Sequence, residues 1–453
     1  MSELKLISQH AGTVLVGQLA VMAFGVADTV IAGRYSDTAL AALSVGSAIY
    51  ISVYVGLIGI VQALLPIWAE MLGAHKHQAM GRSLRQSLYL CGFIVVAGMA
   101  ALLLPGPLLR WAKVPEVMLE DVQRYLTVLA FAFAPSLLFR LYSTFNQSLG
   151  RPVLVTWLQI AALLIKVPLS LWLVGGGLGV EPMGAAGCAW ATLVVNYLLL
   201  ALAVAMLRTQ ELYKPFYIWQ PMERPNWSVI CSFARLGIPG GLAYLVEVTS
   251  FTLMALFIAR LGTVASASHQ IASSMAAVLY MMPLSIAIAC SARVSFWLGA
   301  DRPDHARSVV VLGLKLTVGT SLVLATTLIF GKAAIAGLYS ANAEVIAIAA
   351  SLLGWVAFYH VADSTQALCA FLLRCYRITF VPLALYGVLL WGLGLYGGYT
   401  LTYVGLGGTA ALQSASGFWV ASTLAIGLVA LCFAGLLGVV IGRTPARTTS
   451  NTA

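Results

Sequence analysis

Four charged side chains interrupt long apolar stretches of the sequence and could therefore do chemistry where little water is present. They are the acids Asp28, Glu247 and Asp363 and the base Lys166. A charge in hydrocarbon is costly unless it is protonated, paired or hydrated, so such residues are functional candidates by default. We expect the three acids to bind positive charge, either a proton or inorganic cation or a cationic organic molecule. The structural alternative for each acid is a hydrogen bond between two helices.

The expected depths of these residues group them into two pairs. A rise of about 1.5 Å per helical residue puts Glu247 and Asp363 near mid-membrane in the second half of the chain. Two carboxylates in one dry site cannot both ionise cheaply, so we expect them to share a proton or a cation, either H+ or Na+. The same count puts Lys166 and Asp28 at matching depths, about 22 and 21 Å from the cytoplasmic side. A buried cation needs a buried anion, which predicts an ion pair; alternatively, Lys166 extends to the outer interface.

Polar and aromatic neighbours of the acids are accessory candidates. These are His360, Gln366, Tyr244, Tyr280 and Tyr359. The first two lie three residues before and after Asp363, on one face of a helix. The histidine is either a satisfied polar neighbour or a second titrating group, and we favour the first reading. The tyrosines suit flat cationic ligands through cation–π contacts, whereas the alternative for each is an interfacial belt or plain packing.

Motifs for other chemistry are missing from the sequence. It contains no G-x-x-x-x-G-K-[ST], no H-E-x-x-H, no G-x-S-x-G and no closely paired cysteines among its 7. We therefore expect a protein that is not an enzyme and has no cofactor. The sole metal expected is Na+, as the alternative coupling ion at Glu247 and Asp363.

The composition places these residues in an all-α integral membrane protein. Of the 453 residues, 61% are hydrophobic and 9% are charged, against about 25% charged in a soluble domain. That surplus of apolar side chains excludes a soluble or disordered chain. Twelve apolar stretches are long enough to span a membrane. They lie near residues 11–33, 44–68, 87–109, 125–146, 153–174, 183–207, 236–259, 270–292, 309–330, 346–372, 380–402 and 409–441.

Internal similarity and charge predict the organisation of the twelve spans. The segment at Leu72, "LGAHKHQAMGRS", parallels "LGADRPDHARS" at Leu298, and other segments repeat at a similar offset. Six spans per unit predict two lobes related by a pseudo-two-fold axis along the membrane normal. The predicted order is a lobe at 1–207, a cytoplasmic linker at 208–232, a lobe at 233–442 and a tail at 443–453. Sixteen of the 25 Lys and Arg residues fall on the side of both termini and six on the other, which predicts cytoplasmic termini.

Several motifs together resemble the multidrug and toxic compound extrusion family, in its NorM-like bacterial branch. They are "FGVADTVIAGRYSDTALAALSVGSAIYISV", "GLAYLVEVTSF", "HVADSTQAL" and "LGRP", and the resemblance covers essentially the whole chain. It implies two V-shaped lobes in the bacterial inner membrane and export of organic cations in exchange for entering H+ or Na+. It also implies that Asp28, Glu247 and Asp363 are the acids of the first, seventh and tenth helices.

One departure from the family pattern concerns the fifth helix. The branch usually reads like N-x-P-L-N there, whereas this chain has Lys166, Pro168 and Ser170 at the corresponding places. An ammonium repels a metal cation that an Asn carbonyl would help to bind, which argues against a Na+ site in the first lobe.

Two other functions remain alternatives at this point. A lipid-linked oligosaccharide flippase of the same broad fold would need a more basic cavity, and a membrane-embedded transferase would need a polar cluster near an interface. The expected partners are cationic or amphiphilic small molecules and membrane lipid, without nucleic acid, and we expect a monomer.

Overall fold

The computed structural model describes residues 2–106, 116–177, 179–405 and 410–443. Apart from Arg443, the predicted tail at 443–453 lies outside the described residues. The described chain is helical throughout, with a single isolated β-bridge between Gly177 and Val180. An all-α fold is therefore confirmed.

Twelve helical segments of the described chain are long and apolar enough to cross a membrane, as the sequence predicts. Most are single helices, but the second combines α2 with α3, and the eleventh alternates α-helical and π-helical turns. The elements are α1 (Glu3–Tyr35), α2 (Asp37–Gln62), α3 (Leu65–Gly73), α4 (His77–Leu103), α6 (Glu116–Ser148), α7 (Val153–Gly175), α8 (Ala185–Thr209), η1 (Glu211–Phe216), α9 (Trp227–Ala259), α10 (Thr263–Gly299), α11 (Pro303–Tyr339), α12 (Ala343–Cys375), α13 (Phe380–Tyr386), η2 (Gly387–Tyr396), α14 (Gly397–Tyr399), η3 (Thr400–Val404) and α15 (Ser416–Arg443).

The helices form two compact units whose boundaries fall inside helices. Unit 2 covers Thr13–Gly241, and unit 1 covers Met1–Gly12 together with Leu242–Ala453. Helices α1 and α9 therefore each contribute to both units, whereas the sequence placed the division in the linker at 208–232. The start of α1 is attached to unit 1 because Glu3 accepts hydrogen bonds from Arg293 at 2.5 and 3.0 Å.

Unit 2 is organised around α6, the most deeply buried of the twelve spans. This helix packs against α2, α4 and α8, and its Phe133 and Phe145 are fully buried. The ring of Phe145 meets Trp68 edge to face, with 5.5 Å between the ring centroids. In this unit α7 packs against α8, which brings their polar side chains near one another.

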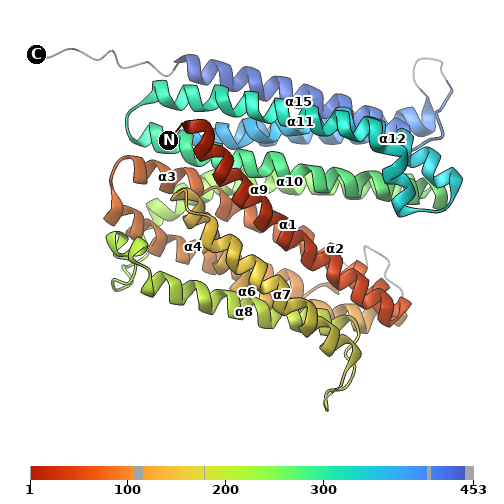
Figure 1. The fold of residues 1–453 in the computed structure, drawn as a ribbon, viewed down its shortest axis with the longest axis horizontal. Helices are drawn as coiled ribbons and strands as arrows, with labels where there is room; N and C mark the ends of the chain where they lie inside the picture. Colours follow the sequence, from red (N-terminus) through yellow and green to blue (C-terminus); the bar gives the residue numbers. More distant parts are fainter. Residues whose placement is uncertain (1, 107–115, 178, 406–409, 444–453) are drawn as a thin grey trace, which may run out of the picture. The chain divides into compact units, whose positions relative to one another are not determined.

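Unit 1 is organised around α12, which packs against α10, α11 and α15 and runs alongside them in the ribbon (Figure 1). The π-helical segment packs on α15. The short helix α14 between the π-helical turns also packs on α15, and its Gly398 permits that approach, because a Cβ atom there would lie 2.6 Å from the Phe418 side chain. The absence of a side chain thus lets two helices meet closely, as small residues do in membrane proteins.

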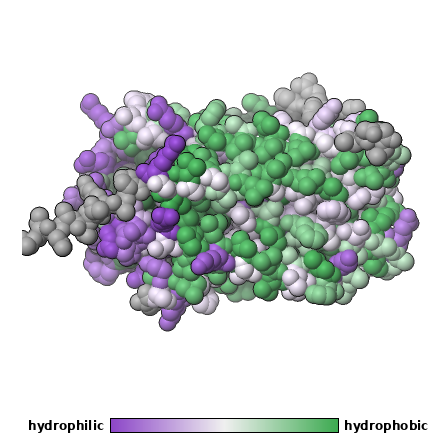
Figure 2. Space-filling view, turned by 90° about the horizontal axis from the view of Figure 1, so that it is seen from above, coloured by the Kyte–Doolittle hydropathy of each residue, from purple (hydrophilic) through white to green (hydrophobic). Residues whose placement is uncertain are grey.

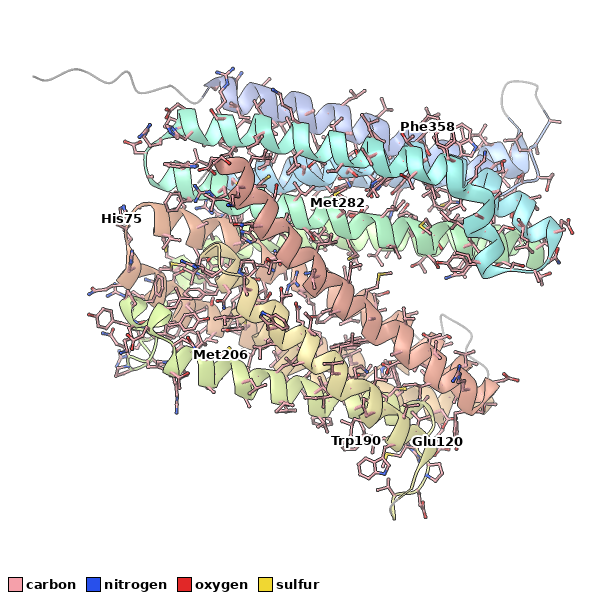
Figure 3. The ribbon with its side chains drawn as sticks, viewed as in Figure 1. His75, Glu120, Trp190, Met206, Met282 and Phe358 are labelled. Atoms are coloured by element: carbon pink, nitrogen blue, oxygen red, sulfur yellow. The ribbon has the colours of Figure 1, made fainter. Side chains whose placement is uncertain are left out.

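The surface agrees with a membrane setting. Hydrophobic side chains cover the middle of the face in view, and hydrophilic ones gather chiefly at one end (Figure 2). Within unit 2, His75 lies towards one end of the helices and Glu120 at the other (Figure 3). The apolar band between the ends is what a hydrocarbon core requires.

Candidate ion-coupling site

A buried ion pair joins two helices of unit 2, α1 and α7. The Lys166 ammonium donates to both carboxylate oxygens of Asp28, at 2.8 and 2.7 Å. Its third hydrogen bond goes to the Thr192 hydroxyl on α8, at 2.9 Å. Lys166 is 1% exposed and Asp28 is 8% exposed. The pair inferred from matched depths is present, and Lys166 does not extend to the interface.

The surrounding residues fix this pair in place. Lys166 and Ser170 lie four residues apart on one face of α7, and the Ser170 hydroxyl donates to Asp28 at 3.3 Å. The Thr192 hydroxyl donates to the Cys188 carbonyl at 2.9 Å, which leaves its oxygen free to accept from the lysine. All three hydrogens of the ammonium are thus satisfied within the protein. The ammonium thus occupies the position beside the Asp28 carboxylate that a bound cation would take.

The second group of acids lies in unit 1, where Asp363 is 4% exposed. The Gln366 amide donates to Asp363 Oδ1 at 2.9 Å. The Tyr386 hydroxyl in turn donates to the Gln366 carbonyl oxygen. This chain holds the carboxyl on the face of α12 that the i+3 spacing predicts, and Tyr386 is a partner that sequence reasoning missed.

Glu247 faces a small cavity in unit 1, within electrostatic reach of Asp363 and Arg374. The cavity has space of about 10 Å³, which is roughly the room that one water molecule needs. Its lining includes Tyr244 and Tyr280, the two aromatic candidates that the structure brings to Glu247. In this state the cavity admits a proton, a water molecule or a bare ion but not a drug-sized molecule.

Arg374 is a charged residue of the cavity that the sequence did not single out, because it falls just beyond the apolar stretch predicted near residues 346–372. It is 6% exposed and lines the cavity with Glu247. Its guanidinium lies over the rings of Phe371 and Tyr244, at 4.7 and 5.1 Å from their centroids. One of its nitrogens, Nη1, is buried without a hydrogen-bond partner in the described structure. The missed signal was its position at the end of a long apolar stretch, where a charge can still be buried.

The other two accessory candidates, His360 and Tyr359, make no hydrogen bond to the acids among the described residues. His360 is 1% exposed, and its Nδ1 lies 3.5 Å from the Ser364 hydroxyl. Tyr359 packs edge to face against Phe251 and Trp419. His360 Nε2 is buried without a hydrogen-bond partner in the described structure, and Tyr359 lies within electrostatic reach of Asp363 and Glu247, so the roles of both residues stay predictions.

The described chain is thus an integral membrane protein with twelve candidate membrane-spanning helices. Its buried carboxylates and the buried Lys166 ammonium are features that an ion-coupled transporter needs. A family model described as MatE matches residues 14–172 and 239–400. These ranges cover more than half of the chain, which therefore belongs to the MatE family.

Curated relatives extend over nearly the whole chain. A probable multidrug resistance protein NorM of Aromatoleum aromaticum is 38% identical and covers 96% of this chain and 94% of its own. The multidrug resistance protein PmpM of Pseudomonas aeruginosa is 31% identical and covers 88% of this chain and 84% of its own.

Solved structures share the fold. The eukaryotic MATE transporter AtDTX14 aligns with a TM-score of 0.86 at 18% identity, covering 98% of this chain and 96% of its own. The Vibrio cholerae MATE transporter VcmN in its bent form aligns with a TM-score of 0.83 at 18% identity, covering 97% of each chain. The predicted family and the twelve-helix fold are both confirmed.

Proposed function

We propose that this protein is a multidrug efflux antiporter, which exports cationic or amphiphilic compounds in exchange for entering protons. The names of its relatives support efflux of drugs. The observation that carries proton coupling is the Asp28–Lys166 pair, because the protein itself supplies the cation at that carboxylate. It works as a monomer in the bacterial inner membrane, with both termini in the cytoplasm.

Protonation of Asp28 can drive a conformational change through this ion pair. When a proton binds Asp28, the ion pair is lost and Lys166 keeps only neutral acceptors, the Thr192 hydroxyl and the remaining carbonyl oxygen of Asp28. An uncompensated buried charge costs about 3–5 kcal/mol. The protein lowers that cost by moving to a state in which water reaches the ammonium. A local charge change thus biases a two-state element, and release of the proton on the cytoplasmic side restores the pair.

The second group of acids binds the substrate and a second ion. Glu247 and Asp363 attract a single positive charge, since Arg374 already balances part of theirs. A drug-sized ligand needs a pocket of roughly 300–1,000 Å³, far more than the 10 Å³ beside Glu247. Substrate therefore binds in a state where this cavity has opened, and H+ or Na+ replaces it when the cavity closes.

Dye transport by the purified protein in liposomes tests this proposal. A pH gradient should drive accumulation of a fluorescent cationic dye, and Asp28→Asn should abolish it. Asp37→Asn is the matched control, because Asp37 is exposed at the start of α2. Dye movement that ignores both pH and Na+ gradients, or equal activity of the two variants, would refute the proposal.

A further inference from the structure

A second cavity lies outside the ion-coupling site, where α3 meets α4 in unit 2. Its volume is about 660 Å³, well within the range of ligand pockets. We call it the α3–α4 pocket and define it by His75, Lys76, His77, Gln78, Ala79, Arg82, Pro215 and Tyr217. The lining residues include the consecutive His75, Lys76 and His77 and also Arg82, and none of them is acidic. The transport mechanism proposed above assigns no role to this pocket.

Ring stacking holds the histidine side chains of the pocket in place. The rings of His75 and His77 stack with 6.2 Å between centroids, and His77 stacks in turn on Phe216 at 5.5 Å. His77 Nε2 is buried and has no hydrogen-bond partner in the described part of the chain. Lys76, the N-cap residue of α4, is exposed and lines the pocket. The pocket therefore presents an ammonium group beside two imidazole rings that are stacked in place.

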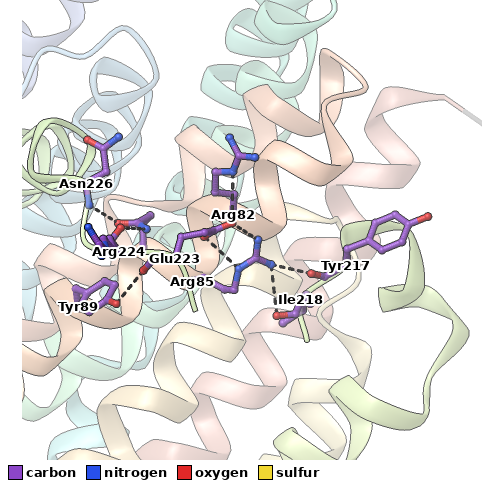
Figure 4. Close-up of polar contacts among 9 residues, drawn as sticks. Arg82, Arg85, Tyr89, Tyr217, Ile218, Glu223, Arg224 and Asn226 are labelled. Carbon is purple, nitrogen blue, oxygen red and sulfur yellow. Dashed lines mark hydrogen bonds and ion pairs between the residues drawn. The ribbon is translucent and has the colours of Figure 1, made fainter. Parts of the chain in front are cut away.

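One wall of the pocket is held by the linker (Figure 4). Glu223 accepts from Arg85 at 2.6 and 3.3 Å and lies 3.5 Å from Arg82 Nε. Arg85 also donates to the Tyr217 carbonyl at 2.7 Å. The Glu223 carboxylate is thus engaged mainly by Arg85, and no ion pair joins Lys76, His75 or His77 to an acid in the described structure.

The internal repeat provides a comparison within the same protein. The turn at Leu298 has the same backbone, because Asp301 has φ 58° where His75 has φ 57°. There Asp304 lies 3.5 Å from Arg302 and 2.9 Å from His305. The corresponding position in the first turn is Gln78. The second turn therefore neutralises its own basic residues, whereas the first leaves them for an external anion.

Exposed aromatic side chains near the pocket resemble those found at the level of lipid headgroups. Tyr217 and Trp219, which follow η1, are about half exposed, and Arg208 lies over the Trp219 ring at 4.5 Å. Exposed Tyr and Trp beside Lys and Arg are typical of a membrane–water interface. Basic pockets between helices on the cytoplasmic side recognise anionic headgroups.

We infer that the α3–α4 pocket binds a phosphate group, carried by the headgroup of an anionic phospholipid or by a free phosphate compound. Lys76 and Arg82 supply the charge, and the stacked histidines supply directed N–H donors to the phosphate oxygens. The lipid is the source that the interfacial aromatics favour.

The test introduces into the first turn, at Gln78, the acidic residue that the second turn has at Asp304. Gln78→Asp places a carboxylate in the first turn of α4, where a negative charge suits the helix dipole and should not disturb folding. Gln78→Asn is the matched uncharged control. Native mass spectrometry of the full-length protein measures retention of phosphatidylglycerol against phosphatidylcholine, and a parallel arm measures thermal protection by inorganic phosphate in lipid-poor detergent.

We expect the parent and Gln78→Asn to retain phosphatidylglycerol preferentially, and Gln78→Asp to retain about fivefold less. If Gln78→Asp instead removes protection by inorganic phosphate and leaves lipid retention unchanged, the pocket binds a free phosphate compound. No preference for either phosphate source, or equal losses in both variants, would overturn the inference. Dye export is not part of the readout, so this outcome is independent of the proposed transport function.

Discussion

Lys166→Met should destabilise the protein in a way that depends on pH. The side chain of Met is close to that of Lys in length but cannot satisfy the two Asp28 oxygens that now accept at 2.7 and 2.8 Å. Because Lys166 is 1% exposed, water does not take its place readily. Leaving a buried charge unpaired costs about 3–5 kcal/mol. We expect a loss of that size in the free energy of unfolding at pH 8.

The loss should shrink as the pH falls. Without the ammonium, a proton on Asp28 removes the unpaired charge, so the variant gains stability relative to the parent on acidification. The double variant Asp28→Asn with Lys166→Met removes both charges and should lie close to the parent, as replaced buried pairs often do. Equilibrium unfolding in mixed detergent micelles at pH 5 and pH 8 measures all three proteins.

The matched control is Lys315→Met, because Lys315 is an exposed lysine within another membrane-spanning helix, α11. The free energy of unfolding of this control variant should stay within about 0.5 kcal/mol of the parent at both pH values. Equal losses for Lys166→Met and Lys315→Met, or a loss for Lys166→Met that is the same at pH 5 and pH 8, would refute the reasoning.

Three further predictions concern the second group of acids and the linker. Glu247→Gln and Asp363→Asn should each abolish ion-coupled dye efflux at normal expression, because an amide cannot take up and release a proton; near-normal efflux by both would remove them from the mechanism. A cysteine introduced in the linker 208–232 should escape an impermeant maleimide in intact cells and react in inverted vesicles; efficient labelling from outside would reverse the orientation. The Arg85 hydrogen bonds lower the pKa of Glu223 below its ordinary 4.5, so its stabilising contribution is complete at pH 7 and is lost as the pH falls through the lowered value. Glu223→Gln should therefore melt below the parent at pH 7, and the difference should narrow as the pH falls below that ordinary value; a constant difference would contradict this.

The sequence predicts the membrane-spanning architecture well because length and hydropathy are local properties. Each of the twelve stretches needs only about 20 apolar residues to be recognised. Local irregularities are harder to foresee. The break between α2 and α3 around Ala63 and the π-helical turns of η2 depend on packing against neighbouring helices, which no short window contains.

The charged residues also divide into those that the sequence could place and those that it could not. Asp28 and Lys166 could be paired from sequence because both sit deep in apolar stretches, so that depth alone matches them. Arg374 could not be placed in this way, since it stands at a helix end where a side chain can reach water or turn inwards. Its burial follows from the Tyr244 and Phe371 rings that flank it, and only the tertiary structure brings Tyr244 to it.

Sodium dependence of the Lys166→Asn variant tests the central claim most directly, namely that an internal ammonium makes the Asp28 site respond to protons. The substitution removes the cation and supplies an amide oxygen that can help to bind Na+. Dye export by parent and variant in liposomes, at fixed pH with and without a Na+ gradient, is the measurement. The account predicts that the variant gains dependence on Na+ relative to the parent and responds less to a pH gradient. Indistinguishable Na+ and pH profiles for the two proteins would contradict it.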